Sequence, residues 1–372
     1  MFKKSLAAVA VLGAFAGSAL AADVQLYGLV DLGLNWTQVD KGTTTTDSFG
    51  MGSGQNSGSR FGLKGTEDLG NGYKVGFNLE NSFKADDGAF DKGSRLFHRE
   101  SILFVETPYG ELSAGRTGGL DSGVGRYGQM GSGATAMSTG WDNIAKTSKV
   151  FLGLGDRMDN TLTYKSPKFA GVTLLAQASL KKSNVNEEGD AIKTEEGSSD
   201  ADRYYALGVT YGAGALNAGL VYSQTDWNRT ELKDQTNDDN QTVVSAFANY
   251  DFGMVKPMVA VQYWDGGLDM VNVEYFKNDG GMTKGYGVVV GATAPVLGGN
   301  FKATVGYNDY ESCTNAYDGN NFMVGVGFEY PLSKRTLVYT AAGYNQFDKD
   351  YANGDKDKEK SSEVMFGMVH KF

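Results

Sequence analysis

Residues 24–36 read VQLYGLVDLGLNW, and this stretch decides the fold class. Every second position from Val24 to Trp36 carries an apolar side chain or glycine. The positions between them carry Gln, Tyr, Asp, Gly and Asn, and Leu29 is the one exception. A period of two with one apolar and one polar face is typical of a β-strand. The stretch therefore predicts a strand with one face in an apolar environment and the other toward water.

The same alternation recurs along the chain. It is clear at 73–83, 301–307 and 322–330, and weaker at 159–166, 172–182, 203–211, 215–225, 243–250, 255–264, 285–294 and 336–346. The segment 94–106 is also interpreted as a strand, although the pattern does not assign its faces. Repeated apolar faces opposite polar ones favour a membrane barrel over an exported β-sandwich or β-helix, because a closed barrel satisfies every backbone group in lipid.

The predicted connections alternate between short and long. Seven short ones, such as 70–72 and 108–110, alternate with eight long polar ones at 38–57, 85–93, 117–157, 183–201, 227–241, 265–283, 311–320 and 347–361. Short periplasmic turns, long external loops and an even strand number are the rule for bacterial barrels. The fold class is therefore predicted as all-β, a transmembrane antiparallel β-barrel of about 16 strands, with both termini on the short-turn side.

Residues 1–21 have the pattern of a secretory signal peptide. Lys3 and Lys4 precede an apolar stretch at 6–16, and Ala19 and Ala21 provide the small residues of a cleavage site. We expect residues 22–372 to form the barrel domain. Beyond residue 21, no apolar run approaches the roughly 18 residues that a spanning helix requires.

Composition argues against several kinds of partner and site. The formal charge of −10 disfavours nucleic acid, which usually needs a basic face. Cys313 is the only cysteine, so no intrachain disulfide can form, and with His98 and His370 as the only histidines neither a metal centre nor a cofactor is expected. The G-x-G-x-x-G match at 123–128 lacks the flanking strand and helix of a dinucleotide site.

A polar lumen favours a water-filled channel for passive diffusion of small hydrophilic solutes and ions. An adhesin or receptor that acts through the long loops is the alternative. A barrel hydrolase is the weaker alternative, because only His98 and His370 could serve as an imidazole base, and Arg99 beside His98 disfavours its charged form. No enzymatic activity is expected.

Five segments resemble the general diffusion porins of Gram-negative bacteria. They are VQLYG at 24–28, SRFGLKGTEDLGNGYKVGFNLE at 59–80, YGELSAGR at 109–116, RMDNTLTYKSPKFAG at 157–171 and GMVHKF at 367–372. The resemblance covers the whole chain and implies a homotrimer of sixteen-stranded outer-membrane barrels, whose third loop folds inward and narrows the pore. The longest connection, which follows Arg116, is the third long one and corresponds to that loop. A connection this long is usually functional or disordered.

The resemblance also implies which residues line the narrowest zone. In similar porins these are the arginine of SRFG, the acid that ends NLE and the first arginine of the fourth strand, which match Arg60, Glu80 and Arg99 here. Arg157 fits a further basic member, and the resemblance implies that acids of the third loop, Asp121 and Asp142, face these arginines. The loop tip GSGATAMSTG is nearly uncharged, which leaves the acidic half of the constriction open.

The charges expected in the lumen favour anions. Strand parity places Arg60, Lys64, Lys74, Arg157, Lys165 and Lys181 on polar faces against Glu80. Loss of Lys3 and Lys4 with the signal takes the charge from −10 to −12, but much of that acid lies in outer loops, where charges act over about 8 Å at physiological salt. We therefore expect a weak anion preference.

The C-terminus carries a predicted assembly signal. Met368, His370 and the terminal Phe372 share the apolar parity of the last strand. We expect the barrel-assembly machinery of the outer membrane to recognise this end, and outer-membrane lipid and lipopolysaccharide to surround the barrel.

Overall fold

The computed structural model describes residues 24–92, 95–137, 141, 149–183, 194–228, 240–268 and 282–372. The expected signal peptide lies outside these residues. The described residues form seventeen strands in one antiparallel sheet. The strands are β1 (Gln25–Asp40), β2 (Thr45–Ser53), β3 (Arg60–Gly70), β4 (Tyr73–Ser82), β5 (Glu100–Thr107), β6 (Gly110–Gly118), β7 (Arg157–Lys165), β8 (Val172–Ser179), β9 (Arg203–Ala213), β10 (Leu216–Asp226), β11 (Asn240–Tyr250), β12 (Lys256–Leu268), β13 (Met282–Val296), β14 (Gly299–Ser312), β15 (Tyr317–Pro331), β16 (Thr336–Tyr351) and β17 (Lys356–Lys371).

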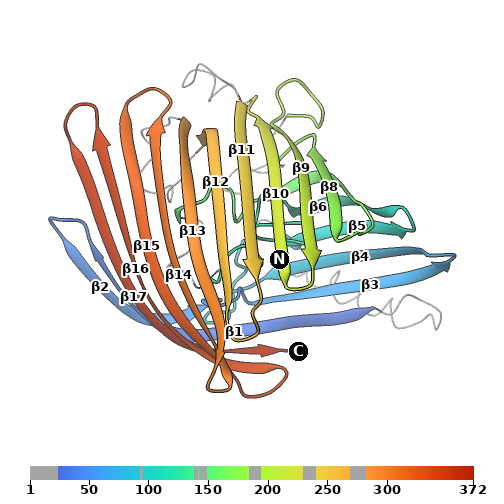
Figure 1. Cartoon of the computed structure of the whole chain (residues 1–372), viewed down its shortest axis with the longest axis horizontal. Coiled ribbons are helices and arrows are strands. Elements are labelled where there is room, and N and C mark those ends of the chain that lie inside the picture. Colours follow the sequence, from blue (N-terminus) through green and yellow to red (C-terminus); the bar gives the residue numbers. More distant parts are fainter. Residues whose placement is uncertain are drawn as a thin grey trace, which may run out of the picture.

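The sheet closes into a barrel because β1 forms hydrogen bonds at both of its edges (Figure 1). β1 pairs with β17 from Leu29 to Asp40 and with β3 from Gln25 to Leu29. β2 pairs with the outer half of β1 and continues through residues 54–59 into β3, so β2 and β3 are two parts of one barrel strand. The ring therefore has sixteen strands, which confirms the predicted fold class.

Both termini lie at the end of the barrel that carries the short turns. The Phe372 amide donates to the Gly28 carbonyl at 3.0 Å, and the Gly28 amide donates to the Phe372 carbonyl at 3.1 Å. At the same end, Asn71 and Gly72 connect β3 to β4 with φ of 53° and 81°. Asparagine and glycine adopt this left-handed conformation with little strain, as a tight hairpin requires.

Three connections that were predicted to be long are short in the structure. The predicted loop 38–57 contains the end of β1 and all of β2, and the predicted loops 311–320 and 347–361 contain the outer ends of β14 to β17. The polar sequence misled the prediction, because these strand ends continue outward with polar side chains on both faces. Cross-strand ion pairs such as Lys358 Nζ–Asp348 Oδ1, at 2.9 Å, join them.

The segment 94–106 gave no alternation because only part of it is a strand. β5 begins at Glu100. Its Leu103 and Val105 face outward and are exposed, while Ile102 and Phe104 face inward and are buried. Apolar residues on both faces of the strand hide the period of two.

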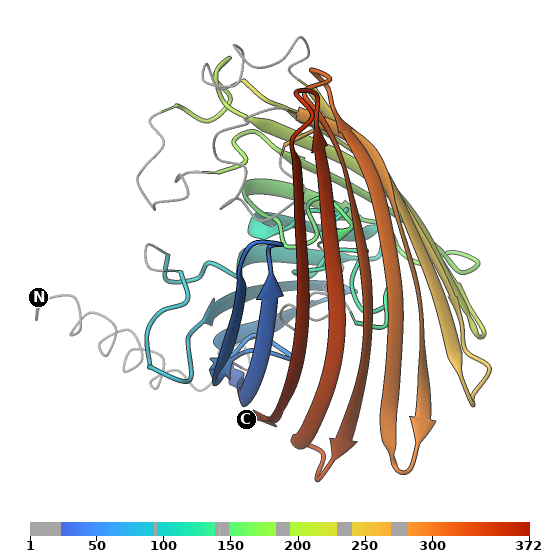
Figure 2. The ribbon, with the colours of Figure 1, turned by 90° about the vertical axis from the view of Figure 1, so that its left-hand side faces the viewer.

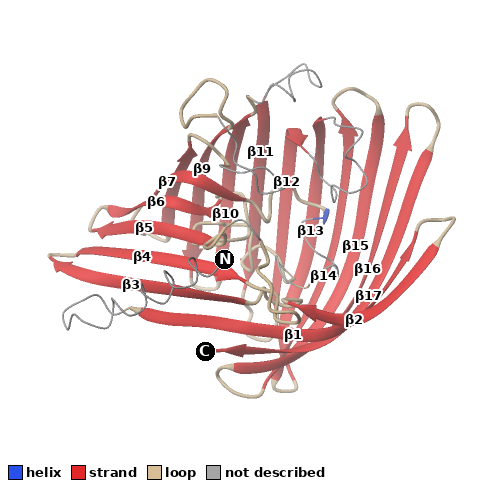
Figure 3. Cartoon of the chain, turned by 180° about the vertical axis from the view of Figure 1, so that it is seen from behind, coloured by secondary structure: helices blue, strands red, loops and turns tan. Residues whose placement is uncertain are grey.

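The barrel has walls of unequal height. The tall wall, β12 to β17 with β1, has strands of 13 to 16 residues. The short wall, β3 to β8, has strands of 8 to 11 residues. Figure 2 shows the long strands of the tall wall side by side, and Figure 3 shows β5, β6 and β7 of the short wall.

The outward face of the sheet is apolar. In β9, for example, Tyr205, Leu207 and Val209 are exposed, whereas Tyr204 and Ala206 between them are buried inside the barrel. An outer apolar band is what the hydrocarbon of a membrane requires. None of the described residues belongs to a helix that is long and apolar enough to cross a membrane.

Candidate functional site

β6 and β7 are joined by residues 119–156, of which the structure describes 119–137, 141 and 149–156, and these described residues, which we call the inner loop, pack inside the barrel. Its first anchor is Asp121, whose buried carboxylate accepts hydrogen bonds from the hydroxyls of Tyr204 on β9, at 2.8 Å, and Ser223 on β10, at 2.5 Å. Burial raises the pKa of Asp121. The expectation that the third loop folds inward is thereby confirmed.

Amide side chains on four strands hold the backbone of the inner loop. Gln262 accepts from the Leu152 amide at 2.5 Å and donates to the Leu152 carbonyl at 3.1 Å. Gln177 accepts from the amide that follows Gly119, and Asn249 and Asn308 donate to the carbonyls of Gly133 and Lys149. A side-chain amide can donate and accept, so it satisfies backbone groups that would otherwise be buried without a partner.

Between these anchors, the inner loop buries apolar side chains against the barrel wall, mostly the tall wall. Met130, Met137, Trp141, Phe151 and Leu154 of the loop belong to one core with Phe247, Val289, Met323, Met365 and Val369 of the wall. Strand parity predicted a polar lumen, and the structure shows that the inner face is apolar where it contacts the inner loop. On β11 and β13, inward apolar residues such as Phe247 and Val289 are one reason why the alternation at 243–250 and 285–294 is less clean in the sequence.

On the short wall, the inner loop is held by charge. Arg126 donates to both carboxylate oxygens of Glu111, at 2.8 and 2.6 Å, and the Tyr127 hydroxyl donates to the same carboxylate at 2.5 Å. The guanidinium of Arg126 lies over the Phe104 ring, 4.2 Å from its centroid. Hydrogen bonding to Glu111 raises the pKa of Arg126, so this anchor stays charged.

A cluster of charged and polar side chains faces the interior from β1, β3, β4 and the residue before β5. Glu80 Oε1 accepts from Arg99 Nε at 2.6 Å, and Glu80 Oε2 lies 3.6 Å from Arg60 Nε. The Tyr27 hydroxyl donates to the same Oε2 at 3.0 Å. The structure thus brings together three of the residues that the sequence singled out, with two guanidinium groups sharing one carboxylate. We call Tyr27, Arg60, Glu80 and Arg99 the charged cluster.

Arg157, the fourth basic residue singled out, opens β7 beside this cluster. Its guanidinium lies within electrostatic range of Arg99 and Glu80. Its buried Nε has no hydrogen-bond partner among the described residues. Of the predicted lumen lysines, Lys64 lies 5.1 Å from the centroid of the Tyr27 ring, whereas Lys181 donates to the Thr194 carbonyl and supports an outer loop.

Residues 54–59, between β2 and β3, form an insert that sequence reasoning assigned to an outer loop. Asp31 of β1, which is completely buried, holds it: Oδ2 accepts from the amides of Asn56 and Ser57, both at 2.7 Å. Asp31 Oδ1 accepts from the Tyr339 hydroxyl of β16, also at 2.7 Å. The one available signal was an acid on the polar parity of β1, followed later by the glycine-rich GQNSGS.

The insert positions Arg60. Arg60 Nη1 donates to the Gly58 carbonyl at 3.2 Å and lies 3.4 Å from the Ser57 hydroxyl. Because Asp31 fixes the amide of Ser57, it acts on the guanidinium through the backbone of the insert. Asp31 is therefore a positioning residue for the charged cluster.

The placement expected for Asp121 is corrected by the structure. Asp121 bonds the hydroxyls of β9 and β10 and does not face the arginines, because it turns toward buried donors at the start of the loop. Asp142, the second expected loop acid, lies outside the described residues. Strand parity says nothing about side chains in a connection, so neither direction could be read from the sequence.

An acid that the sequence did not single out joins the wall to the loop. Glu100 accepts from Thr117 Oγ1 at 2.7 Å and from the Arg126 amide at 2.8 Å. It was missed because the segment 94–106 showed no alternation. Among the described residues, no group of three or more His, Cys, Asp and Glu side chains is placed to hold a metal ion.

His98 lies behind the charged cluster, just before β5. Its ring nitrogens contact Ser82 Oγ at 2.8 Å and Asn81 Oδ1 at 3.0 Å. Burial, reinforced by Arg157, lowers the pKa of His98 to about 4. The sequence analysis named Arg99 as the residue that disfavours the charged form of His98. Arg99 lowers the pKa of His98 less than burial and Arg157 do.

The C-terminal residues close the ring of strands. The Phe372 ring covers Gly28, where an added Cβ would lie 2.4 Å from the ring. His370 Nδ1 contacts Thr336 Oγ1 at 2.9 Å, and Met368 is exposed on the outward face. All three residues keep the outward parity that the sequence indicated.

A closed sixteen-stranded barrel with an apolar outer band, a long loop packed inside and a charged inner side defines a class. It is the class of water-filled outer-membrane channels through which small hydrophilic solutes and ions diffuse passively. The chain belongs to the Gram-negative porin family, whose sequence profile matches residues 7–350. It is accordingly a protein of the bacterial outer membrane.

Relatives and solved structures agree with this assignment. The chain is 29% identical to an outer membrane porin protein of Bordetella pertussis and 28% identical to outer membrane porin protein 32 of Delftia acidovorans, in each case over the full length of both chains. An anion-selective porin from Comamonas acidovorans has a similar structure, with a TM-score of 0.67 and 25% identity over 95% of this chain and all of that one.

Proposed function

We propose that this porin weakly prefers anions, and that Arg60, Glu80, Arg99 and Arg157 line the narrowest part of its pore. The observation that carries the proposal is the sharing of Glu80 by Arg60 and Arg99. One carboxylate cannot neutralise two guanidinium groups, so the cluster keeps a positive charge. Arg157 adds to that charge.

The negative net charge of the chain would favour cations, whereas the charged cluster favours anions. The distance of each group of charges from the passing ion decides which effect is larger. Solutes meet the charged cluster at close range inside the barrel, whereas acids in outer loops act across solvent that screens them within about 8 Å at physiological salt. Fixed charges in a narrow, partly desolvated passage have the larger effect on an ion. The anion selectivity of the similar porin from Comamonas acidovorans supports the same sign.

Reversal potentials in a salt gradient test this proposal. The wild-type channel should be weakly anion-preferring at high salt and shift toward cations as salt falls, because the outer loops become less screened. Replacing both Arg60 and Arg99 by Ser should abolish or reverse the preference and raise the single-channel conductance. The control variant K334S/R335S removes the same charge from an exposed turn. Equal reversal potentials and conductances in wild type and R60S/R99S would contradict the assignment.

We also propose a route of assembly. Residues 1–21 direct export and are removed, residues 22–372 form the barrel, and Phe372 with Met368 and His370 is read by the barrel-assembly machinery. The exposed position of these residues at the chain end supports their recognition. Phe372→Ala should lower the amount of heat-modifiable barrel in the outer membrane, and unchanged amounts would contradict this role.

The functional unit that we propose is a homotrimer in a membrane that contains lipopolysaccharide. A solved structure with the same fold, an outer membrane protein of Vibrio cholerae, is a trimer form. β5 and β8 have 8 residues each, below the roughly 9–11 residues of a spanning strand, and we infer that the wall around β5 packs on protein. Mass measurement in mild detergent should give three mature chains, and a conducting monomer would contradict it.

A further inference from the structure

We propose that the insert, residues 54–59, forms the third side of the narrowest zone of the pore and sets the size limit for uncharged solutes. The inner loop covers much of the tall wall, the charged cluster occupies the wall around β3 and β4, and the insert lies between them. The inference rests on the proposed place of the narrowest zone beside the charged cluster, and it adds the element that limits solute size.

A pair of glycines on the inner face of the barrel forms a seat for the insert. Gly33 on β1 and Gly52 on β2 are partners in register. A Cβ added at Gly52 would lie 2.6 Å from Gln55 Nε2, and one added at Gly33 would meet Gln55 Oε1. Glycine at both positions lets the Gln55 side chain lie flat against the two strands, where it is buried. The insert is therefore fitted to the wall.

Hydrogen bonds to strands beyond β1 fix the insert in place. Besides the amides held by Asp31, Gln55 Oε1 accepts from the Tyr339 hydroxyl of β16 at 3.2 Å. Asn56 Nδ2 donates to Glu329 Oε1 of β15 at 2.9 Å. Because β17 lies between β1 and β16 in the ring, the insert crosses the inner face of β17. It therefore narrows the lumen at one fixed position.

At this end, the insert meets the inner loop. Glu329 Oε1 also accepts from Lys302 Nζ of β14 at 2.8 Å. Lys302 Nζ lies 5.1 Å from the centroid of the Trp141 ring of the inner loop. An edge-to-face contact joins the same Trp141 to Tyr339, with 6.0 Å between the ring centroids. Wall residues between the two inward segments thus join them into one continuous rim.

At its other end, the insert meets the charged cluster. The Gly58 carbonyl accepts from Arg60, and a Cβ added at Gly58 would lie 3.1 Å from Arg99 Nη1. Between the two ends, Asn56 and Ser57 are partly exposed. Since the insert lies on the inner face of the barrel, these uncharged side chains border the passage. Such a surface limits the size of a solute without selecting its charge.

Liposome swelling with uncharged sugars of increasing size tests this role in the purified full-length channel. Gly52→Ala places a methyl group against Gln55 and pushes the insert away from the wall into the passage. The permeation rate of a trisaccharide, relative to that of a monosaccharide, should fall about threefold, because this ratio depends steeply on pore diameter. The double variant G52A/Q55A removes the obstructing side chain and should restore the wild-type ratio.

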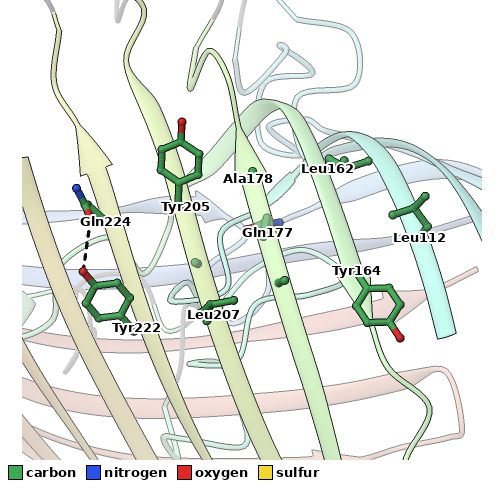
Figure 4. Close-up of a pocket in the computed structure, with 11 residues that line it drawn as sticks. Leu112, Leu162, Tyr164, Gln177, Ala178, Tyr205, Leu207, Tyr222 and Gln224 are labelled. Carbon is green, nitrogen blue, oxygen red and sulfur yellow. Dashed lines mark hydrogen bonds between the residues drawn. The ribbon is translucent and has the colours of Figure 1, made fainter. Parts of the chain in front are cut away.

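Two control variants should leave the ratio unchanged. Gly50→Ala adds the same methyl group two residues away on the same face of β2, and no described atom lies within 4 Å of it. Ala178→Leu adds volume on the outward face of β8, in the apolar groove that Leu162 and Leu207 border (Figure 4). Heat-modifiability on gels shows that each variant has folded.

Ser57→Cys gives a second test that leaves the glycine seat intact. In a background with Cys313→Ser, labelling this variant with a bulky uncharged maleimide should lower the sugar ratio about threefold, whereas the unlabelled variant should permeate sugars like wild type. An unchanged ratio in both Gly52→Ala and the labelled Ser57→Cys channel, or an equal fall for both sugars, would overturn the proposal. A wild-type channel without the expected ion preference would count only against the proposed function, because the sugars carry no charge.

Discussion

The inner face of the tall wall and that of β3 and β4 in the short wall differ in chemistry. The tall wall presents Val289, Met323 and Met365, which are completely buried under the inner loop. The short wall carries Arg60 and Glu80 in the charged cluster. The described part of the inner loop covers much of the tall wall and also contacts β5 to β10, whereas β3 and β4 carry the charged cluster. We infer that the open passage lies along the charged cluster.

The free energy of burial explains why the inner loop covers the apolar side chains of the tall wall and not the charged cluster. Burying methionine and valine side chains under the loop lowers the free energy of the folded protein. Removing arginine side chains from water raises it. A loop that covered β3 and β4 instead would bury the charged cluster and expose the apolar side chains of the tall wall. The comparison explains how one loop can narrow a channel and leave its charged side wet.

The largest effect is expected when a charge is placed on the apolar side. Val289→Asp puts a carboxylate where no solvent reaches, which costs on the order of 3–5 kcal/mol unless the loop detaches. We expect the loop to leave the tall wall, so that single-channel conductance rises and the unfolding temperature falls. Planar-bilayer recording and heat-modifiability on gels measure the two effects.

Val289→Ala is the control for this experiment, because it removes volume without adding charge. It should lower stability by only about 1–2 kcal/mol and leave conductance unchanged. If Val289→Asp conducts like wild type, the inner loop does not depend on its apolar contacts with the tall wall.

A smaller effect is expected when the short wall loses a support of its charge. Asp31→Ala removes the acceptor of two insert amides and of the Tyr339 hydroxyl, which costs about 2–3 kcal/mol. Arg60 then loses its fixed position, so the ion preference should fall while the barrel still folds. Reversal potential and heat-modifiability, measured on the same preparation, distinguish these outcomes.

Two further variants sharpen this test. Asp31→Asn keeps part of the hydrogen bonding and should recover part of the ion preference. Asp47→Ala removes the same charge from an exposed position of β2 and should leave the preference unchanged. An Asp31→Ala channel with the wild-type reversal potential would show that Arg60 does not depend on the insert.

The smallest effect concerns the pH dependence of the short wall. The pKa of His98 is about 4 in the folded chain and about 6.5 in an unfolded one, so between these values the unfolded chain binds a proton that the folded chain does not. Stability should therefore fall as pH decreases from 6.5 to 4, by on the order of 2 kcal/mol relative to His98→Gln. Urea unfolding of both proteins in vesicles measures the difference. Parallel curves across this window would contradict it, whereas parallel curves above pH 7 are expected.

The fold was accessible to sequence reasoning because a strand repeats every two residues. The alternation in residues 24–36 and the rhythm of short turns gave the barrel, the strand number and the side of the termini. The sequence pattern is misleading where polarity has another cause. The polar outer ends of β1 and β16 have the composition of loops. In β5, Ile102 and Phe104 pack under the inner loop, so both faces of the strand are apolar and the alternation is lost.

The site was accessible only in part, for a related reason. Arg60 and Glu80 lie on strands, where parity gives their direction, and the resemblance to porins added Arg99. Asp121, Arg126 and the insert lie in connections, where the direction of a side chain depends on distant contacts. The hydroxyls that bind Asp121 belong to Tyr204 and Ser223, more than eighty residues away in the chain.

We propose that ions pass along the charged cluster while the inner loop covers the tall wall. Thiol labelling of single conducting channels tests it, in a background where the exposed Cys313 is replaced by Ser. Lys64 is exposed beside Tyr27, and Val289 is completely buried under the loop. With Lys64→Cys, a charged water-soluble thiol reagent should change the current irreversibly, and with Val289→Cys the current should stay constant. Equal labelling of both positions, or labelling of Val289→Cys alone, would contradict the account.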